Sequence, residues 1–388
     1  MNTNIVVYSI VGLICAILLS YTLTPLVRVL SFKIGAIDVP KDRRRMHKKP
    51  IPLIGGLAIF LSFLLTSLFF CDITSELLLL FGGALLIVIV GILDDIYCLN
   101  AWLKLIAQIA AAAIPVLGGI QITRIELGGS YVELGIWSIP LTIFWITGLT
   151  NAINFIDGLD GLSCGVSTIS SISIFAVLII QGVDYGSILV TLILIGACAG
   201  FLPYNRNPAK IFMGDTGALF LGYTMSFISI QGMFKLHTVI SIIVPLIIFA
   251  LPLADTLFAI IRRLIAGKSP FSADRGHLHH RLVDMGFTQK ESVNILYSIC
   301  GILGLVAVFM CDNMFKEHSF IKSAAIAVTA ILLFLLYIIV LRNPSDKEHT
   351  GLSEAVEESK PHAANEEKKN SDNADPALQE NGTDEKKG

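Results

Sequence analysis

Charged residues are scarce in this sequence. They make up only 15% of the 388 residues, while hydrophobic residues make up 54%, and a soluble globular domain carries roughly 25% charged residues. The apolar residues stand in long blocks of about the length that a bilayer-spanning helix needs. The scarcity of charge therefore excludes an ordinary soluble protein and predicts an all-α polytopic membrane protein.

Cysteines with a metal-binding or redox spacing are also lacking. The seven cysteines are scattered, mostly in or beside apolar blocks, without a CxxC pair, so we interpret them as small packing residues. The first 20 residues have neither a basic start nor a small-residue cleavage pattern, which predicts a retained first span rather than a cleaved signal peptide.

Large apolar residues almost disappear after Ser345, where Glu, Asp, Lys, Asn and Ser prevail. Such a composition cannot bury a core, so we expect a disordered tail there. The net charge of −2 hides a slightly basic membrane part and an acidic tail. The sequence thus predicts two parts, a transmembrane domain over 1–342 and a charged cytoplasmic tail over 343–388.

About eleven transmembrane helices are expected from the apolar blocks, and Lys and Arg predict their orientation, because basic residues favour cytoplasmic links. Basic residues gather after blocks one, seven and nine, which places the N-terminus outside and the C-terminus in the cytoplasm. The blocks are 4–27, 51–70, 76–93, 101–118, 137–156, 162–181, 187–203, 212–232, 238–261, 292–311 and 321–341.

Polar residues recur at every third position where the fifth block ends. The segment 151–161 reads NAINFIDGLDG, and residues three apart lie near one another on a helix, so Asn151, Asn154 and Asp157 are predicted to form a polar edge. Polar groups at membrane depth indicate a functional site. A hydrated helix end that carries turn residues is the alternative, although a simple turn needs neither two amides nor two carboxylates.

Further acids fall on the same predicted cytoplasmic side. Asp94 and Asp95 form a carboxylate pair at the end of block three, which suits a divalent cation or a phosphate-orienting base but also occurs in ordinary turns. Asp215 starts block eight and could be only a helix cap. Lys104 could be a lysine that snorkels to the interface, and Phe212 either stacks on a base or is an interfacial aromatic.

The segment ADRGHLHHRL places three histidines beside two arginines. Three clustered histidines are typical of a zinc site. However, the other candidate ligands are Asp and Asn, and such oxygen-rich sites suit Mg²⁺ or Mn²⁺. Imidazoles beside arginines suit a polyanion, and a solvated loop is the alternative. The basic stretch that holds Lys48 and Lys49 serves either orientation or a nucleotide diphosphate. Asp255, inside block nine, needs a partner, for which we favour a neighbour in the spans.

Together these residues predict a cytoplasm-facing site at the lipid boundary. Carboxylates, amides and cations there suit transfer of a phosphorylated group from a charged soluble donor to a lipid phosphate. A membrane transporter lined by acids is an alternative of another class, but transporter sites usually lie near the midplane. An intramembrane aspartyl protease needs GxGD, and position 212 is Phe, which argues against it.

Four motifs in this order resemble those of the polyprenyl-phosphate N-acetylhexosamine-1-phosphate transferases. They are LDD at 93–95, NAINFIDGLDGL at 151–162, IFMGDTG at 211–217 and RGHLHH at 275–280, within a likeness that covers about 1–342. The HLHH form is similar to the HIHH form of the GlcNAc branch rather than to the HHHFE-type run of the muramoyl-pentapeptide branch.

The resemblance implies a role for each matching residue. Asp215, with Asn154, would hold Mg²⁺, with Mn²⁺ as a substitute. Asp94, Asp95, Asp157, Asp160 and His279 would be catalytic, with Asp157 and Asp160 also beside the nucleotide. The residues implied in substrate binding are Lys48, Lys49, Lys104, Asn151, Asn154, Asn205, Phe212, Arg275, His277 and His280.

The implied reaction moves GlcNAc-1-phosphate from UDP-GlcNAc to undecaprenyl phosphate, in a bacterial cell membrane with the active site facing the cytoplasm. It would start a cell-envelope polysaccharide such as teichoic acid or O-antigen. The phospho-MurNAc-pentapeptide transferase of peptidoglycan synthesis is the alternative within the class. Membrane lipid is an expected partner and nucleic acid is not, while a homodimer stays open.

Overall fold

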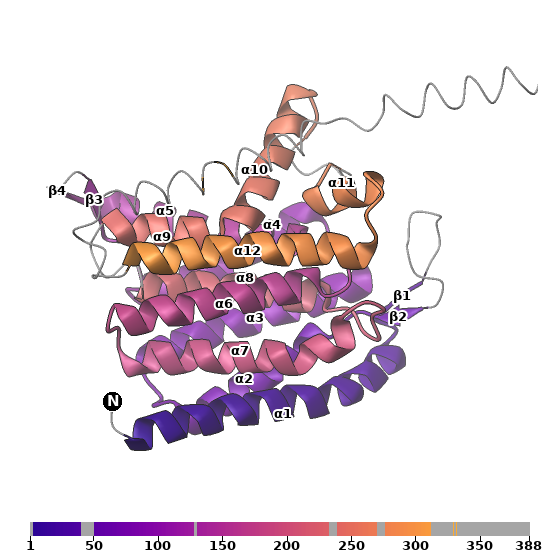
Figure 1. Ribbon diagram of the computed structural model, residues 1–388, viewed down its shortest axis with the longest axis horizontal. Coiled ribbons are helices and arrows are strands. Elements are labelled where there is room, and N and C mark those ends of the chain that lie inside the picture. The colour runs from indigo at the N-terminus through magenta and orange to yellow at the C-terminus, as the bar shows by residue number, and fades with distance from the viewer. Residues whose placement is uncertain are drawn as a thin grey trace, which may run out of the picture. The chain divides into compact units, whose positions relative to one another are not determined.

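The computed structural model describes residues 3–39, 50–127, 130–232, 239–269 and 276–311, with Thr329 and Ile331. These residues form a helical bundle with two small antiparallel strand pairs (Figure 1). The helices are α1 (Thr3–Ile34), α2 (Gly56–Phe70), α3 (Ser75–Tyr97), α4 (Ala101–Leu117), α5 (Ser138–Phe155), α6 (Leu162–Ile180), α7 (Tyr185–Asn205), α8 (Gly214–Gly232), α9 (Val239–Ile248), α10 (Ala250–Ile265), α11 (Leu278–Asp284) and α12 (Gln289–Cys311).

The predicted all-α membrane class is confirmed by the helices. Ten of the eleven predicted apolar blocks coincide with helices or a helix pair, while block 321–341 lies outside the described residues except for two positions. Among the described helices, six are long and apolar enough to cross a membrane, and α9 with α10 would make a seventh. The count of eleven spans and the orientation of the termini stay predictions.

Block nine is two helices instead of one straight span. Helices α9 and α10 meet at an angle of 78° around Phe249. Pro252 stands in the first turn of α10, where its ring nitrogen cannot donate the hydrogen bond that would continue the ladder back to Ile248. Apolarity extends across this break, so the block pattern alone did not reveal it.

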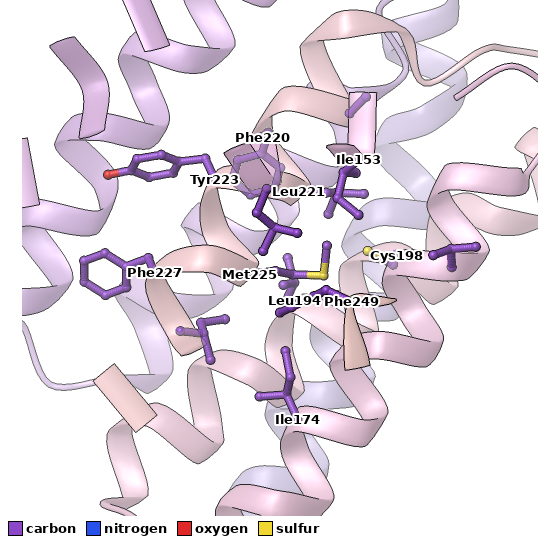
Figure 2. Packing of buried hydrophobic residues seen from close by; sticks show 14 of the residues in the cluster. Ile153, Ile174, Leu194, Cys198, Phe220, Leu221, Tyr223, Met225, Phe227 and Phe249 are labelled. Carbon is purple, nitrogen blue, oxygen red and sulfur yellow. The ribbon is translucent and has the colours of Figure 1, made fainter. Parts of the chain in front are cut away.

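Helix α8 is the centre of the bundle. Every residue from Thr216 to Gly232 is buried, and α8 packs against α2, α3, α5, α6 and α7. In Figure 2, Met225 lies beside Leu194 while Phe227 projects from the opposite side of the helix, and all three belong to the buried apolar core. A helix buried on all sides must be apolar all round, which explains why no amphipathic stripe marks it.

Small residues let other helices approach the start of α8 closely. A Cβ added at Gly56 of α2 would overlap the backbone of Gly217, and a Cβ added at Gly91 of α3 would lie 2.5 Å from Cα of Thr216. Such small residues are how helices approach one another in membranes, where van der Waals packing replaces the hydrophobic drive. The packing fixes the ends of α2, α3 and α8 relative to one another.

The two strand pairs lie at opposite ends of the bundle (Figure 1). Strands β1 (Ile37–Asp38) and β2 (Ile51–Pro52) pair beside the end of α1, and β3 (Arg124–Leu127) pairs with β4 (Ser130–Glu133) in the link before α5. Neither pair is predicted by the sequence pattern. Two- to four-residue strands leave too short a pattern to recognise.

Candidate active site

The ends of α3 and α5 meet the starts of α4 and α8 around one lysine. Lys104 Nζ lies 2.6 Å from Asp94 Oδ2 and 2.7 Å from Asp215 Oδ2. Asn154 donates from Nδ2 to the other oxygen of Asp215, at 3.0 Å. Residues from four helices thus form one hydrogen-bonded cluster, which we call the Lys104 cluster (Asp94, Lys104, Asn154 and Asp215).

Lys104 is an ion-paired residue rather than a lysine that extends freely into solvent. Its side chain is only 23% exposed, and its ammonium lies between two carboxylates. Asp94 also accepts from the Leu99 backbone N–H at 2.7 Å with its second oxygen, which fixes the carboxylate at the end of α3. The Lys104 cluster is therefore positioned by the turn between α3 and α4.

Asp95 caps the N-terminus of α8. Its carboxylate accepts from the backbone N–H groups of Asp215 and Thr216 at 2.9 and 3.1 Å, and from the Thr216 hydroxyl at 2.6 Å. A carboxylate at this position satisfies orphan N–H groups and complements the helix dipole. Asp95 therefore lies beside the Lys104 cluster, and its contacts hold the first turn of α8, which contains Asp215.

Gly214 makes this close contact feasible. Its φ is +69°, a left-handed conformation that favours glycine, and an added Cβ would lie 2.5 Å from Asp95 Oδ2 and clash with the Leu53 carbonyl. In the GDTG sequence, Gly214 is therefore needed for its left-handed backbone, and Asp215 contributes its side chain to the Lys104 cluster.

Asn151, three residues before Asn154 in α5, faces α4 but joins neither Asp94 nor Asp215. It exchanges hydrogen bonds with Gln108 of α4, at 2.5 and 3.3 Å, and donates to the Thr147 carbonyl at 2.8 Å. Sequence reasoning missed Gln108, although it lies four residues after Lys104 and hence on the same helix face. The pair ties α4 to α5 and so holds Lys104 beside Asn154.

The segment after α5 brings two more acids to this end. Asp160 accepts from Asn207 Nδ2 at 2.9 Å and from the Ala209 backbone N–H at 3.0 Å, and thereby fastens the link before α8. Asp157 lies in the same segment, and burial, reinforced by the charges of Asp215, Asp95 and Asp160, raises its pKa well above the usual value. A carboxyl group with a raised pKa at a cavity wall is a candidate for a functional role.

A cavity of about 820 Å³ opens at these helix ends. Its size falls within the ~300–1,000 Å³ range of small-molecule sites. The predicted site residues that line it are Asp95, Asp157, Asp160, Asn205, Phe212, Asp215 and His280. Two basic residues that were not among the predicted site residues, Arg28 of α1 and Lys210, line it as well. A smaller cavity of about 290 Å³, lined by Asp72 and Asp184 among others, contains no predicted site residue.

Asn205 and Phe212 border the cavity through a tightly held link. Asn205 is buried and donates to the Ile211 carbonyl at 3.1 Å, while its Oδ1 finds no hydrogen-bond partner among the described residues. The backbone of Phe212 donates to the Pro52 carbonyl at 2.8 Å and accepts from Gly55 at 2.9 Å. The aromatic ring is thus presented from a fixed backbone, between β2 and the start of α8.

The three histidines occupy three different positions. His280 lines the cavity, whereas His277 and His279 are buried and do not border it. Burial lowers the pKa of His279 to about 3, with the neighbouring His280 adding to the effect, so this ring is neutral at physiological pH. The ring of His279 packs against Gly158, which lines the cavity, and its catalytic role stays a prediction.

The remaining predicted residues either have a different partner from the one expected or lie outside the described residues. The partner of Asp255 is His277, at 2.9 Å between Oδ2 and Nδ1, and not a neighbour in the spans as expected. Lys48, Lys49 and Arg275 lie outside the described residues. The structure thus brings Asp94, Lys104, Asn154 and Asp215 into one cluster. Other predicted site residues line the cavity beside it, among them Asp157, Asp160 and His280.

Comparison with known proteins identifies the family of this chain. Residues 77–233 match the family model described as glycosyl transferase family 4. The chain is 39% identical over 334 residues, 85% of its length and 89% of the relative's, to the probable undecaprenyl-phosphate N-acetylglucosaminyl 1-phosphate transferase of Bacillus subtilis.

Two further relatives lie in other bacteria. The decaprenyl-phosphate N-acetylglucosaminephosphotransferase of Mycobacterium tuberculosis is 36% identical over 83% of this chain and 87% of its own. The undecaprenyl-phosphate alpha-N-acetylglucosaminyl 1-phosphate transferase of Yersinia pestis is 29% identical over 80% and 85%. Since these likenesses extend over most of each chain, the protein belongs to glycosyl transferase family 4, among the polyprenyl-phosphate N-acetylhexosamine-1-phosphate transferases.

Proposed function

We propose that this protein transfers GlcNAc-1-phosphate from UDP-GlcNAc to undecaprenyl phosphate, giving undecaprenyl-diphospho-GlcNAc and UMP. The observation that carries the proposal is the Lys104 cluster, in which Lys104 Nζ lies 2.6 and 2.7 Å from the carboxylates of Asp94 and Asp215. It stands at the ends of apolar helices and beside a cavity of nucleotide-sugar size. The names of the relatives support the donor sugar and the lipid acceptor.

The reaction replaces one phosphoanhydride by another. An oxygen of the lipid phosphate forms a bond to the β-phosphorus of the donor, the bond from that phosphorus to the bridging oxygen breaks, and UMP leaves. Positioning and electrostatic stabilisation provide most of the catalysis in phosphoryl transfer. Arg28 and Lys210 in the cavity wall supply positive charge for the diphosphate, and Phe212 supplies a face for the base.

Two routes lead to the same products. The lipid phosphate attacks directly, assisted by Asp94 or Asp95, or an aspartate first forms a phosphosugar intermediate and UMP leaves before the lipid reacts. Rapid quenching with donor labelled in its β-phosphate and without lipid separates them. A labelled covalent adduct would rule out the direct route.

Mg²⁺ fits the chemistry of the cluster, and we assign it to Asp215 and Asn154. The ammonium of Lys104 lies within 2.7 Å of two carboxylate oxygens, so this position already accommodates a cation. Oxygen donors without thiol or imidazole suit Mg²⁺, with Mn²⁺ as a substitute. Among the described residues no three His, Cys, Asp or Glu side chains are grouped to hold a metal, so donor phosphates would complete the ligand set. When bound, the ion would neutralise diphosphate charge.

The proposal includes the setting of the enzyme. We assign catalysis to residues 1–342, with eleven spans in a bacterial cell membrane, the N-terminus outside and the cavity facing the cytoplasm, and we assign no catalytic role to 343–388. The predominance of basic residues in the links on the cavity side supports this orientation. The product would be the first lipid-linked intermediate of a cell-envelope polysaccharide such as teichoic acid or O-antigen.

The decisive experiment measures UMP released by purified protein from UDP-GlcNAc and added undecaprenyl phosphate. We expect release that EDTA abolishes and Mg²⁺ restores, and that Asp215→Asn and Asp94→Asn each remove while the variants stay monodisperse. Release from UDP-MurNAc-pentapeptide alone would overturn the GlcNAc assignment. Solute flux in proteoliposomes without any UMP release would instead indicate a transporter.

A further inference from the structure

Asp255 is a buried carboxylate that neither the Lys104 cluster nor the cavity uses. It is only 2% exposed and lies on α10, just after the 78° bend that directs this helix away from α9. An ionised carboxylate in such a place must be paired and hydrogen-bonded, because its desolvation is otherwise costly. Its partners therefore report what the residue is for.

Both carboxylate oxygens of Asp255 contact the start of the histidine segment. Oδ2 lies 2.9 Å from His277 Nδ1, and Oδ1 accepts from the Leu278 backbone N–H at 2.8 Å. Because a carboxylate only accepts, Nδ1 of His277 must carry the proton, and in the neutral ring Nε2 is then the acceptor. The pair thus fixes the position of the ring and also its tautomer.

A second residue of the same helix holds the same segment. Arg262 follows Asp255 by seven residues, which places both on one face of α10, and its guanidinium packs so closely on Gly276 that an added Cβ would overlap it. Arg281 in turn donates from Nε to the Gly276 carbonyl at 3.1 Å. One face of α10 therefore anchors the beginning of the histidine segment, and α11 lies beside α10 in Figure 1.

The anchored ring is the first of three imidazoles in contact. The rings of His277 and His279 are stacked, with centroids 5.8 Å apart and planes at 11°, and the His279 and His280 centroids lie 4.2 Å apart. His280 borders the cavity together with Asp157 and Asp215. Anchoring the start of this segment at His277 and Leu278 therefore contributes to the position of His280 at the cavity wall.

We propose that Asp255 is a positioning residue of the active site, which holds the histidine segment in place and keeps His277 in its Nδ1–H form so that His280 stands at the cavity. The effect on catalysis rests on the proposed function, whereas the structural effect does not. Around metal-ligating histidines, loss of the partner that orients the ring costs about 10- to 100-fold in affinity or activity, and we take this range as the scale for Asp255. We expect this range for the loss of kcat/KM with UDP-GlcNAc in Asp255→Asn.

Three readouts on the full-length protein test the proposal. Asp255→Ala should speed backbone hydrogen exchange at 277–284 at least about tenfold, because the Leu278 N–H loses its acceptor. Asp255→Asn keeps the shape, but its amide can donate to His277 Nδ1 and should shift this ring to the Nε2–H tautomer, visible by ¹⁵N NMR of labelled imidazoles. The third readout is kcat/KM. His277→Gln identifies the resonance.

Asp184→Ala is the matched control. Asp184 caps α7 through Ser187, accepting from its N–H at 2.9 Å and from its hydroxyl at 2.8 Å, and should leave exchange at 277–284 unchanged and activity within about twofold. Unchanged exchange in Asp255→Ala, or a wild-type tautomer with full activity in Asp255→Asn, would overturn the proposal. If the wild type releases no UMP, hydrogen exchange and NMR still test the structural role of Asp255. If Asp255→Ala does not fold, the His277 tautomer in Asp255→Asn tests it.

Discussion

At the scale of single residues, the cation between two carboxylates is the central feature. Lys104 offsets one of the two negative charges of Asp94 and Asp215, so the three side chains form one electrostatic unit with a net charge of about −1. Binding of a further cation or a phosphate beside this unit requires that the lysine ammonium stays within hydrogen-bond distance of both carboxylates. The geometry of this unit depends on Asn154, which donates to Asp215. It also depends on the amide pair of Gln108 and Asn151, which holds α4 against α5.

Replacing Lys104 by Met should lower kcat/KM for UMP release at least about 100-fold, or about 2.7 kcal/mol in transition-state stabilisation. The two carboxylates would then repel each other without a cation between them. Lys104→Arg should retain more activity than Lys104→Met because it keeps the charge, and Lys33→Met, an exposed change on α1, should retain full activity. Equal activity of Lys104→Met and the wild type would contradict the role.

His279 should make the protein less stable as pH falls. Its folded pKa of about 3 lies below the ordinary 6.5, so between these values the unfolded ring binds a proton that the folded ring does not. The free energy of unfolding should therefore decrease on acidification through this window, by up to about 1.4 kcal/mol per pH unit, and be unaffected by this residue above it.

Thermal midpoints of detergent-solubilised protein between pH 7.5 and 5 test this expectation. His279→Gln, which does not titrate, should show a flatter dependence than the wild type. The same slope in both proteins would mean that His279 is protonated in the folded state, contrary to its burial.

At the scale of elements, the start of α8 determines where the site forms. The helix is buried along its length, and its first turn is held by Asp95 below and by the close packing of α2 and α3. Asp215 therefore has no freedom to move along the helix axis. The bend between α9 and α10 has a related effect, since it places Asp255 beside the histidine segment.

Gly214→Ala should damage this element more than its small size suggests. The left-handed backbone costs about 1–2 kcal/mol for an L-residue, and the methyl group would displace Leu53 or Asp95. We expect a lower thermal midpoint and at least about tenfold less UMP release. Gly148→Ala, in α5 with open space around it, is the control and should be neutral. Full activity of Gly214→Ala would show that the α8 cap is dispensable.

At the scale of the molecule, the site requires that alternate helices end on one side. Contacts between the end of α3, the start of α4 and the start of α8 satisfy this requirement, and so do those between Asp160 and the link after α7. Large apolar residues stay exposed along α1 and on outer faces of other helices, as expected for surfaces that meet lipid.

Cysteine labelling in intact cells tests the proposed orientation. In a cysteine-free background, Asp72→Cys in the link after α2 should react with a membrane-impermeant maleimide, because that link is predicted to be outside. Lys48→Cys should react only after permeabilisation. The reverse pattern would place the cavity outside and exclude a cytoplasmic nucleotide-sugar as donor.

The helices could be predicted from the sequence because burial in a membrane demands long apolar blocks, and ten of these blocks lie where the helices are. The bend between α9 and α10 could not be predicted, because a proline within an apolar block does not by itself show that the helix bends or by how much. Likewise the acids were recognised by type and spacing, while the pairing of Asn151 with Gln108 needed knowledge of which helices are neighbours.

The sequence by itself determined the membrane class, the apolar blocks, and the set of acids and amides at their ends, since these follow from local composition and periodicity. Only the tertiary structure decided that Lys104 joins Asp94 to Asp215, that Asp95 caps α8, and that His280 rather than His279 reaches the cavity. These are contacts between residues ten or more positions apart or choices between adjacent rings. They depend on helix packing, which no local pattern encodes.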